Sequence, residues 1–465
     1  MKGILSYGAY IPYNRLQRIK LKEFFGTSVF AGEKAVASFD EDSVSMGVEA
    51  AYDCLGGLHE KTVNSVYFST TSGPYKEKSS VPTIVRALDL GANVQGIELA
   101  HSLRSGTSAI LAANLEETTL VIASDCRNGA PTGTNEQVFG DGAAALLLGS
   151  GENVIARIVD GCTLQEEIVG EWRSQSDAFT QNWEERFISG VFLQNVTEAV
   201  TTFIKKNDIT LDSIAKVIIS GPGHRSYLQA AKKLGFKPEQ IQDSLLTSVG
   251  AAGTAHAPML LVSSLEEAEP GDRILLLNFA EGTDILLFEV TDAITNLPKR
   301  NGVKGHLSIK NNELSYSDYA KWRGIIEVEP PRRPEVDRPS APAMYRNYNQ
   351  NLGFYGSKCV ACGSPQFPKQ RVCIQCQAKD QMEDYRFVGQ TAKIATYTID
   401  YLAASPASPS FWAVIDFHNG GRIICEVTDC SKDEIEIGME VEMSFRRLYE
   451  AKGIHNYFWK ARPKR

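Results

Sequence analysis

The stretch from Lys358 to Gln377, KCVACGSPQFPKQRVCIQCQ, decides the fold of the C-terminal part of this chain. Its cysteines form two Cys-x2-Cys pairs with ten residues between them: Cys359, Cys362, Cys373 and Cys376. Each pair directs two thiolates at one point, and two pairs complete the tetrahedron that Zn2+ prefers. Turn-forming residues surround the pairs, so the segment has little core of its own and depends on its metal. We therefore predict a structural zinc ribbon, with a redox dithiol or two disulfides as the alternative.

Length and composition indicate a large globular chain. It has 465 residues, of which 43% are hydrophobic and 22% are charged, and its formal net charge is -8. An acidic chain argues against general nucleic-acid binding. The first residues lack the features of a signal peptide, no apolar run reaches the length of a bilayer span, and the other cysteines form no disulfide framework. We expect a cytoplasmic protein that binds neither nucleic acid nor a membrane.

A proline-rich segment with alternating charges, residues 329–342, divides the chain, and its composition favours an extended linker. Before the linker, short apolar runs predict buried strands, and longer stretches have helical spacing. The expected strands are 65–69, 120–124, 143–149, 217–220, 274–279 and 284–290, and the expected helices are 42–55, 106–115, 194–206 and 225–234. The segments 120–124 and 140–149 resemble 274–279 and 281–290, which indicates two similar α/β halves, residues 1–160 and 161–328.

Beyond the linker, residues 343–380 hold the zinc ribbon and residues 381–465 change to a β pattern. Four segments alternate apolar and polar residues between turn clusters: 391–401, 411–417, 421–428 and 439–446. They predict a small closed barrel of the oligonucleotide- or oligosaccharide-binding (OB) type. From Phe445 to Arg465, seven lysines and arginines are interleaved with aromatic residues. We expect this tail to bind a flat, phosphate-bearing ligand, with a solvated terminus as the alternative.

Five short motifs in the first 295 residues carry a family resemblance: GAYIP at 8–12, GEKAV at 32–36, DEDSV at 40–44, WRS at 172–174 and WEERF at 183–187. Together they resemble the 3-hydroxy-3-methylglutaryl-CoA (HMG-CoA) synthase branch of the thiolase superfamily. The part after the linker resembles the zinc-ribbon and OB-fold (DUF35) domain that accompanies some thiolase-like enzymes as a separate subunit. The resemblance implies a duplicated, five-layered αβαβα core, a homodimer formed through it, and a coenzyme A thioester as the substrate.

Thiolase-fold chemistry uses a cysteine nucleophile at the start of a buried helix, and a histidine and a glutamate to move protons. Aligning the flanking motifs places the family's cysteine at Leu103, its glutamate at Thr71 and its histidine at Ser220. The asparagine of a glycine-rich loop falls near Ala251. Because Leu103 has no nucleophilic atom, we do not expect an acyl-enzyme. Ser102 and Ser105 are neighbours of this position, but each is displaced along the chain and neither has an evident base in the sequence.

We therefore expect non-covalent aldol or retro-aldol chemistry on a 3-hydroxyacyl-CoA, which needs a base and donors at the thioester oxygen. The candidate proton-moving residues are His101, His224, His256 and Tyr75, and the candidates for binding the phosphates of coenzyme A are Arg104 and Arg225. One alternative is a Claisen-type, HMG-CoA synthase-like acyltransferase with a relocated nucleophile. The other is a non-catalytic acyl-CoA-binding scaffold. We consider a hydratase or a dehydrogenase as a partner protein.

Overall fold

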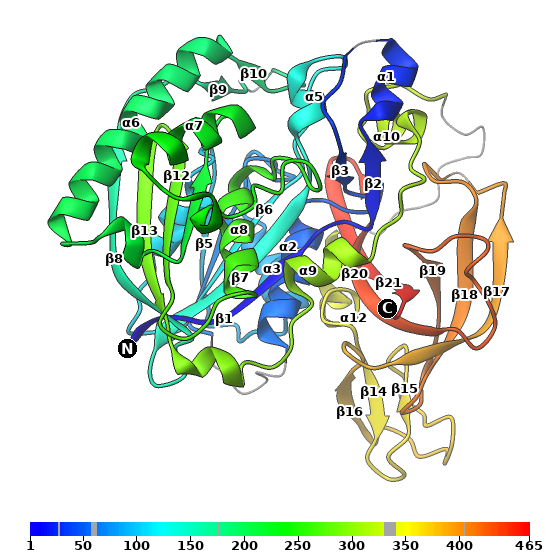
Figure 1. The fold of residues 1–465 in the computed structure, drawn as a ribbon. Helices are drawn as coiled ribbons and strands as arrows, with labels where there is room; N and C mark the ends of the chain where they lie inside the picture. The colour runs from blue at the N-terminus through cyan, green and yellow to red at the C-terminus, as the bar shows by residue number, and fades with distance from the viewer. Residues whose placement is uncertain (27, 57–62, 175, 330–340, 404) are drawn as a thin grey trace. The chain divides into compact units, whose positions relative to one another are not determined.

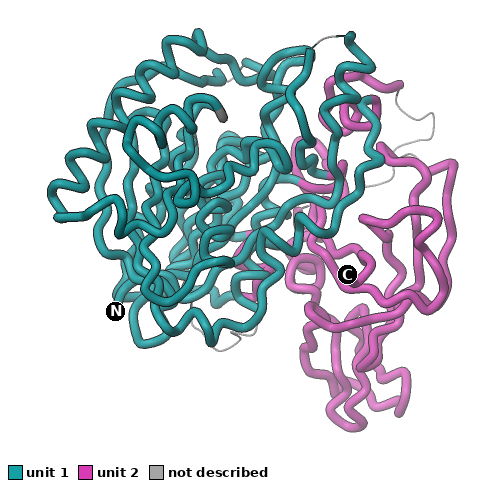
Figure 2. Tube along the Cα trace, in the orientation of Figure 1, with its two compact units in different colours: residues 1–37, 42–82, 90–316 teal, residues 38–41, 83–89, 317–465 magenta. Residues whose placement is uncertain are grey.

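The computed structural model describes residues 1–26, 28–56, 63–174, 176–329, 341–403 and 405–465 (Figure 1). The chain forms two compact units, which are coloured separately in Figure 2. Unit 1 comprises residues 1–37, 42–82 and 90–316, and unit 2 comprises residues 38–41, 83–89 and 317–465. The predicted linker, 329–342, lies almost wholly outside the described residues.

Unit 1 is built from alternating strands and helices. Its strands are β1 (Lys2–Tyr10), β2 (Asn14–Gln17), β3 (Glu33–Val36), β4 (Ser65–Ser69), β5 (Gln95–Leu99), β6 (Thr119–Asp125), β7 (Gly142–Ser150), β8 (Ala156–Gln165), β9 (Glu171–Trp172), β10 (Gln181–Asn182), β11 (Lys216–Ser220), β12 (Arg273–Ala280) and β13 (Gly282–Val290). Its α-helices are α1 (Ile19–Phe25), α2 (Ser43–Leu55), α4 (Ser105–Ala112), α5 (Thr134–Val138), α6 (Glu185–Lys206), α7 (His224–Leu234), α8 (His256–Leu265) and α9 (Gly302–Ser308). Short 3-10 helices are η1 (Leu211–Ser213), η2 (Pro238–Gln240), η3 (Gly253–Ala255) and η4 (Asp292–Asn296).

The main sheet repeats one strand arrangement twice. Among the described residues its order is β11-β12-β13-β8-β1-β7-β6-β4-β5. In one half, β4 is parallel to β6, and the pairs β6–β7 and β7–β1 are antiparallel. In the other half, β11 is parallel to β12, and the pairs β12–β13 and β13–β8 are antiparallel. The predicted likeness of the two strand pairs, which are β6 with β7 and β12 with β13, is therefore confirmed. The predicted boundary between the halves, at residue 160, falls within β8.

Two helices lie between the halves of the sheet. Helix α8 packs against β11 and β12 of its own half and also against β7 and β1 of the other half. Helix α4 contacts β4, β5 and β6, and also β13. Helix α2 covers β1, β6 and β7, whereas α6 covers β12 and β13 (Figure 1). These contacts produce the expected five layers, with α4 and α8 in the middle. The first residues of α4, Ser105 to Thr107, are therefore buried.

By length and composition alone, α6 also meets the criterion for a membrane-spanning helix. Core helices meet the same criterion, and α6 buries Phe192, Val196, Val200 and Phe203 in a cluster with residues of β11, β12 and β13. We therefore describe α6 as a helix of this core.

Unit 2 combines a small sheet with a closed barrel. Its strands are β14 (Tyr355–Cys359), β15 (Pro365–Gln366), β16 (Met382–Arg386), β17 (Ala392–Asp400), β18 (Ser410–Phe417), β19 (Arg422–Val427), β20 (Glu440–Ala451) and β21 (Ile454–Pro463). Helices α3 (Val81–Ala87) and α10 (Tyr316–Trp322) lie mostly in this unit, together with α11 (Ala341–Arg346) and α12 (Tyr348–Asn351). The barrel order is β17-β18-β19-β21-β20, and β15-β14-β16 form the ribbon sheet. The four strands expected from the alternating pattern are β17 to β20.

The predicted ligand-binding tail, residues 445–465, forms the second half of β20 and all of the fifth barrel strand, β21. Strand β21 pairs along its whole length with β20. Trp459 is 1% exposed, Lys460 is 2% exposed and Arg446 is fully buried. Because these three side chains are buried, they are unavailable to a flat ligand, and the prediction that they form part of a ligand-binding tail is wrong.

A buried cluster of charges explains why residues 38–41 belong to unit 2. Lys460 Nζ donates to Asp40 Oδ2 at 2.9 Å, and Arg446 Nη1 lies 2.6 Å from Glu41 Oε1. Arg447 N also donates to Asp40 O at 2.8 Å. Burial by itself would raise the pKa of Asp40, but Lys460 and Arg446 outweigh it and hold that pKa below its usual value. The charges are paired, as buried charges have to be.

Candidate functional site

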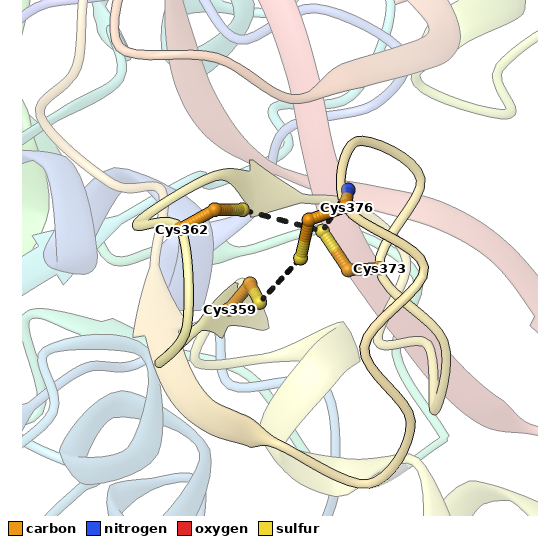
Figure 3. A group of neighbouring side chains, drawn as sticks. All are labelled: Cys359, Cys362, Cys373 and Cys376. Atoms are coloured by element: carbon orange, nitrogen blue, oxygen red, sulfur yellow. Dashed lines mark hydrogen bonds between the residues drawn. The ribbon is translucent and has the colours of Figure 1, made fainter.

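The four cysteines of the ribbon form a metal site (Figure 3). Their sulfur atoms all lie within 4.8 Å of one another. The Sγ atoms of Cys359 and Cys376 are 3.6 Å apart, and those of Cys362 and Cys373 are 3.5 Å apart. Tetrahedral Zn2+ with Zn–S bonds of about 2.3 Å requires sulfur separations of about 3.8 Å, so the set fits zinc. Four thiolates complete the coordination sphere, and the site is structural because no position is open to a substrate.

Backbone amides favour the thiolate form in this site. The N–H groups of Cys376 and Gln375 donate to Cys373 Sγ at 3.5 and 3.4 Å. These two bonds, the one from Cys376 first, lower the pKa of Cys373 to about 6. The thiolate is the form that binds a metal, so this local geometry favours metal binding at Cys373. At Cys362 the backbone N–H of Ser364 lowers the pKa, but burial and the other three thiols outweigh it and raise the pKa to about 12.

The start of α4 forms the centre of a second candidate site, in unit 1. After β5, His101 has a φ of 77°, and the chain then enters the helix through Ser102 and Leu103. Ser102 Oγ accepts from Arg104 N at 3.1 Å and donates to Glu281 Oε2 at 2.7 Å. His101 is exposed, and Ser102, Leu103 and Glu281 are half-buried. A carboxylate from the β12–β13 turn therefore lies at the entrance to α4.

Asp125, the last residue of β6, organises the loops beside this entrance. Its fully buried carboxylate accepts from Thr70 Oγ1 at 3.0 Å, from Ser72 Oγ at 2.7 Å and from Thr254 N at 2.7 Å. It also accepts from the backbone N–H of Thr71 at 2.7 Å and from its hydroxyl at 3.0 Å. Hydrogen bonds to the ionised form compensate a buried carboxylate for lost water. Asp125 thus holds the β4 loop and η3 in one arrangement.

The approach of α4 to η3 needs a glycine. A Cβ atom on Gly106 would lie 2.4 Å from Thr254 O, closer than real side chains approach a backbone oxygen. Thr254 Oγ1 in turn donates to Ser69 O at 3.1 Å. The ends of β4 and β6, the start of α4 and the start of α8 therefore converge on one small region.

Arg104 is buried in unit 1, and its guanidinium group is hydrogen-bonded to other side chains. Its Nη1 donates to Asp284 Oδ1 at 2.8 Å and to Thr163 Oγ1 at 2.9 Å, and its Nη2 donates to Gln165 Oε1 at 2.6 Å. Asp284 accepts further from Thr107 Oγ1 at 2.7 Å. This buried network favours a structural role for Arg104 over the predicted role in phosphate binding.

His256 begins α8 and is buried, with Nδ1 3.5 Å from the backbone N–H of Ala252. Burial lowers the pKa of His256 to about 4, because removal from water disfavours the charged imidazolium. The imidazole is therefore neutral at pH 7 and is held by the loop that precedes it.

Comparisons with known proteins describe both parts of the chain. The family model for the C-terminal domain of 3-oxoacyl-[acyl-carrier-protein] synthase III matches residues 204–286. The models for the rubredoxin-like zinc ribbon and the C-terminal OB-fold domain of ChsH2 match residues 353–383 and 385–446. The chain joins a thiolase-like core to a ChsH2-type zinc ribbon and OB-fold. The expected fusion and the structural zinc site are both confirmed.

Relatives of the thiolase-like core are synthases. Hydroxymethylglutaryl-CoA synthase of Methanothermobacter thermautotrophicus is 27% identical over 348 residues, which is 70% of this chain and 100% of that protein. The synthase of Methanocaldococcus jannaschii is 28% identical over 346 residues, with the same coverage. A structure of HMG-CoA synthase complexed with CoA has a TM-score of 0.63 at 19% identity and covers 69% of this chain and 89% of that one. MvaS in complex with HMG-CoA has a TM-score of 0.61 at 17% identity and covers 74% and 95%.

The four residues to which the resemblance assigns catalytic groups lie on four different segments of unit 1. Leu103 is at the entrance to α4, Thr71 is bonded to Asp125, Ser220 ends β11, and Ala251 forms a bridge with Phe139 in the loop before η3. Hydrocarbon and hydroxyl groups thus occupy positions that the resemblance gives to a thiol, a carboxylate, an imidazole and an amide.

Other predicted residues lie on different elements of the core. Tyr75 is half-buried in the loop before α3, with Lys78 Nζ 4.7 Å from its ring centre. Arg225 is exposed on α7. His224 is the first residue of α7, and its side chain is outside the described part of the structure. His101 and His256 lie on adjacent elements, since α4 packs against η3 and α8, but no hydrogen bond joins them within the described chain.

Two residues of this region are missing from the candidates that the sequence predicts. Asp125 and Glu281 both stand at the carboxyl ends of strands, β6 and β12, where functional groups of α/β sheets gather. The pattern of a carboxylate directly after a buried strand was available in the sequence. The contacts of these carboxylates were not, because Thr70 and Ser102 reach them from other elements.

Proposed function

We propose that this chain is an acyl-CoA enzyme that forms or breaks a carbon–carbon bond of a 3-hydroxyacyl-CoA without a covalent intermediate. Its relatives are HMG-CoA synthases, and similar structures contain CoA or HMG-CoA, which supports a coenzyme A thioester as the substrate. The observation that carries the proposal is Leu103 at the entrance to α4, where the resemblance places the nucleophilic cysteine. A hydrocarbon side chain cannot form an acyl-enzyme.

Aldol chemistry suits a core that keeps the scaffold and has lost the thiol. The retro-aldol direction needs a base for the 3-hydroxyl group and donors for the thioester oxygen, on which the enolate charge develops. The first turn of an α-helix leaves N–H groups without intrahelical partners, and its dipole favours negative charge. At α4 the N–H groups of Arg104 and Ser105 donate to Ser102, each at 3.1 Å, so this helix contributes the positive end of its dipole. The Asp125 network keeps the neighbouring loops in place.

Turnover of 3-hydroxyacyl-CoAs tests the proposal. The purified full chain should release an aldehyde or ketone and a shorter acyl-CoA. Chromatography of the CoA products measures this release. After incubation with acetyl-CoA, intact mass should remain that of the unmodified chain. Leu103→Cys is the positive control for this mass measurement, since a thiol at a helix start is activated by the dipole. Absence of cleavage together with an acyl adduct on the wild-type chain would overturn the proposal.

The Ser102–Glu281 hydrogen bond supports a second candidate function, a Claisen-type acyltransferase with a relocated nucleophile. A serine that donates to a carboxylate at 2.7 Å has a base for its proton. This candidate predicts an acetyl adduct that maps to Ser102 by peptide mass spectrometry and is absent from Ser102→Ala. CoA binding without either turnover or an adduct would favour the non-catalytic scaffold.

The assembly of the chain is also a proposal. We infer a homodimer formed through the thiolase-like core and a hydratase or dehydrogenase as a partner that supplies or consumes the 3-hydroxyacyl-CoA. Light scattering of the purified chain tests the first expectation, and a chain that stays monomeric at micromolar concentration contradicts it.

A further inference from the structure

We infer that the carboxylate of Glu281 is the general base of the reaction and that Ser102 is its positioning residue. The inference rests on the proposed function and names the group that removes the proton from the 3-hydroxyl of the acyl-CoA. Glu281 stands outside every position that the resemblance assigns to catalysis.

Glu281 occupies the tip of a tight turn. Strands β12 and β13 pair up to Ala280 and Gly282, so Glu281 alone connects them. Gly282 has a φ of 102°, and a Cβ there would lie 2.0 Å from Leu164 O. The turn is therefore fixed against β8, and the Glu281 side chain starts from a defined backbone position.

Further contacts hold this turn beside α4. Asn278 Nδ2 donates to Thr107 Oγ1 at 3.0 Å and lies 3.4 Å from Leu103 O. On the other strand, Asp284 binds Arg104 Nη1 and Thr107 Oγ1. Contacts on both sides of the turn thus set the distance between Glu281 and the entrance to α4, as preorganised catalysis requires.

One oxygen of Glu281 is open. Ser102 Oγ binds Oε2 at 2.7 Å, and within the described residues no donor reaches Oε1. Glu281 is half-buried, and His101, which precedes Ser102 in the chain, is exposed, so this edge of the site is partly open to solvent. A carboxylate base needs one oxygen that can take the proton of the substrate, here Oε1, while a hydrogen bond to the other oxygen, Oε2, holds the carboxylate in place.

The chemistry balances without a co-reactant. Oε1 takes the proton of the 3-hydroxyl, the O–H electron pair forms the new C=O bond, and the C2–C3 bond breaks. Its electron pair moves to C2 and the thioester carbonyl as an enolate, whose negative charge the dipole at the start of α4 favours. The carboxylic acid of Glu281 then returns the proton to C2, and the aldehyde or ketone and the shorter acyl-CoA leave.

A purely structural explanation is that Ser102 caps α4 and Glu281 only holds Ser102. Ser102 Oγ does accept from Arg104 N at 3.1 Å, so the two explanations need separate variants. Glu281→Gln keeps the size of the side chain and can still accept from Ser102, and Ser102→Ala removes the donor. Glu152→Gln, at an exposed glutamate in the loop after β7, is the matched control.

We expect kcat/KM of Glu281→Gln for retro-aldol cleavage to fall about 10²- to 10⁴-fold, as for other general bases. Its affinity for the product acyl-CoA, by calorimetry, should stay within about threefold of wild type because CoA contacts remain. Ser102→Ala should lose less, through kcat rather than KM, because the carboxylate keeps its place on the turn but loses its anchor. Ser102→Thr, which keeps the hydroxyl donor, should restore kcat, whereas a purely structural effect of Ser102→Ala would not be rescued in this way. Glu152→Gln should behave as wild type.

Exchange of the C2 protons of a short acyl-CoA in D2O, measured by NMR, separates this inference from the proposed function. Cleavage by wild type that persists in Glu281→Gln overturns the inference and leaves the proposed function intact. Exchange without cleavage, lost in Glu281→Gln, overturns the aldol reaction and the role of Glu281 at the 3-hydroxyl, and assigns Glu281 to the C2 proton instead. If wild type shows neither cleavage nor exchange, or if it carries an acyl adduct on Ser102, the inference and the proposed function are both overturned.

Discussion

His256 makes the stability of unit 1 depend on pH. Burial lowers the pKa of His256 to about 4, whereas an unfolded histidine has a pKa of about 6.5. Between these values the unfolded chain binds more protons, so stability is fully present above about pH 6.5 and falls as the pH approaches 4. The size of the loss is at most about 3 kcal/mol.

We expect His256→Gln to remove this part of the pH dependence. Urea midpoints measured at about pH 7.5 and about pH 5 should differ less in the variant than in wild type. His418→Gln is the control, because His418 is exposed. An identical pH dependence of wild type and His256→Gln would contradict the assignment.

At the scale of single elements, the ribbon is the segment whose fold depends on an ion. Its strands β14, β15 and β16 are short, and two of its cysteines, Cys362 and Cys376, are exposed. Coordination energy has to replace the apolar burial that such a segment lacks.

Removal of the metal should therefore unfold the ribbon sheet and leave the thiolase-like core folded. We expect about one zinc per chain, lost on chelation or in Cys362→Ser. Hydrogen exchange should then become fast in β14–β16 and stay slow in β1 and β7. Cys430→Ser is the matched control, since Cys430 is outside the cluster. Protection of β14–β16 that survives complete loss of zinc would refute the dependence.

At the scale of the whole molecule, the first ninety residues contribute two segments to unit 2. Asp40 and Lys460 are 420 positions apart in the sequence, and both are almost fully buried. Arg386 Nη2 similarly donates to Ala87 O at 2.6 Å. Some buried charged side chains of residues 317–465, such as Lys460, therefore form ion pairs with residues from the first ninety positions of the chain.

We expect Asp40→Asn to destabilise unit 2 by about 3–5 kcal/mol, because it leaves Lys460 buried with one carboxylate fewer. Asp416→Asn is the control: its partner Arg422 is exposed, and such pairs contribute about 0–1 kcal/mol. Lys460 and Arg446 hold the pKa of Asp40 low, so its contribution is present above about pH 4 and is lost below it. Denaturation followed by Trp459 fluorescence should show a difference from wild type that shrinks on acidification. Equal effects of both variants would contradict the prediction.

Local patterns in the sequence determined a large part of the fold. Apolar runs identified β4, β6 and β12 because a strand buried on both faces is continuously apolar, and the spacing of Cys359 and Cys362 identified the metal site because both ligands come from one turn. The same reasoning misread β21, since Lys460 and Trp459 look like surface residues until Asp40 and the barrel interior surround them.

The sequence by itself determined six strands of the main sheet, four strands of the barrel, the duplication, the zinc ligands and the absence of a thiol at Leu103. Each of these depends on residues close together in the chain. It did not identify β1, β5 or β8 of the main sheet. Only the tertiary structure decided which distant groups meet. Arg104 binds Asp284 across 180 positions, and Ser102 binds Glu281 across 179. Such pairs form because the sheet and α4 bring the two residues together, and the sequence around either residue does not identify its partner.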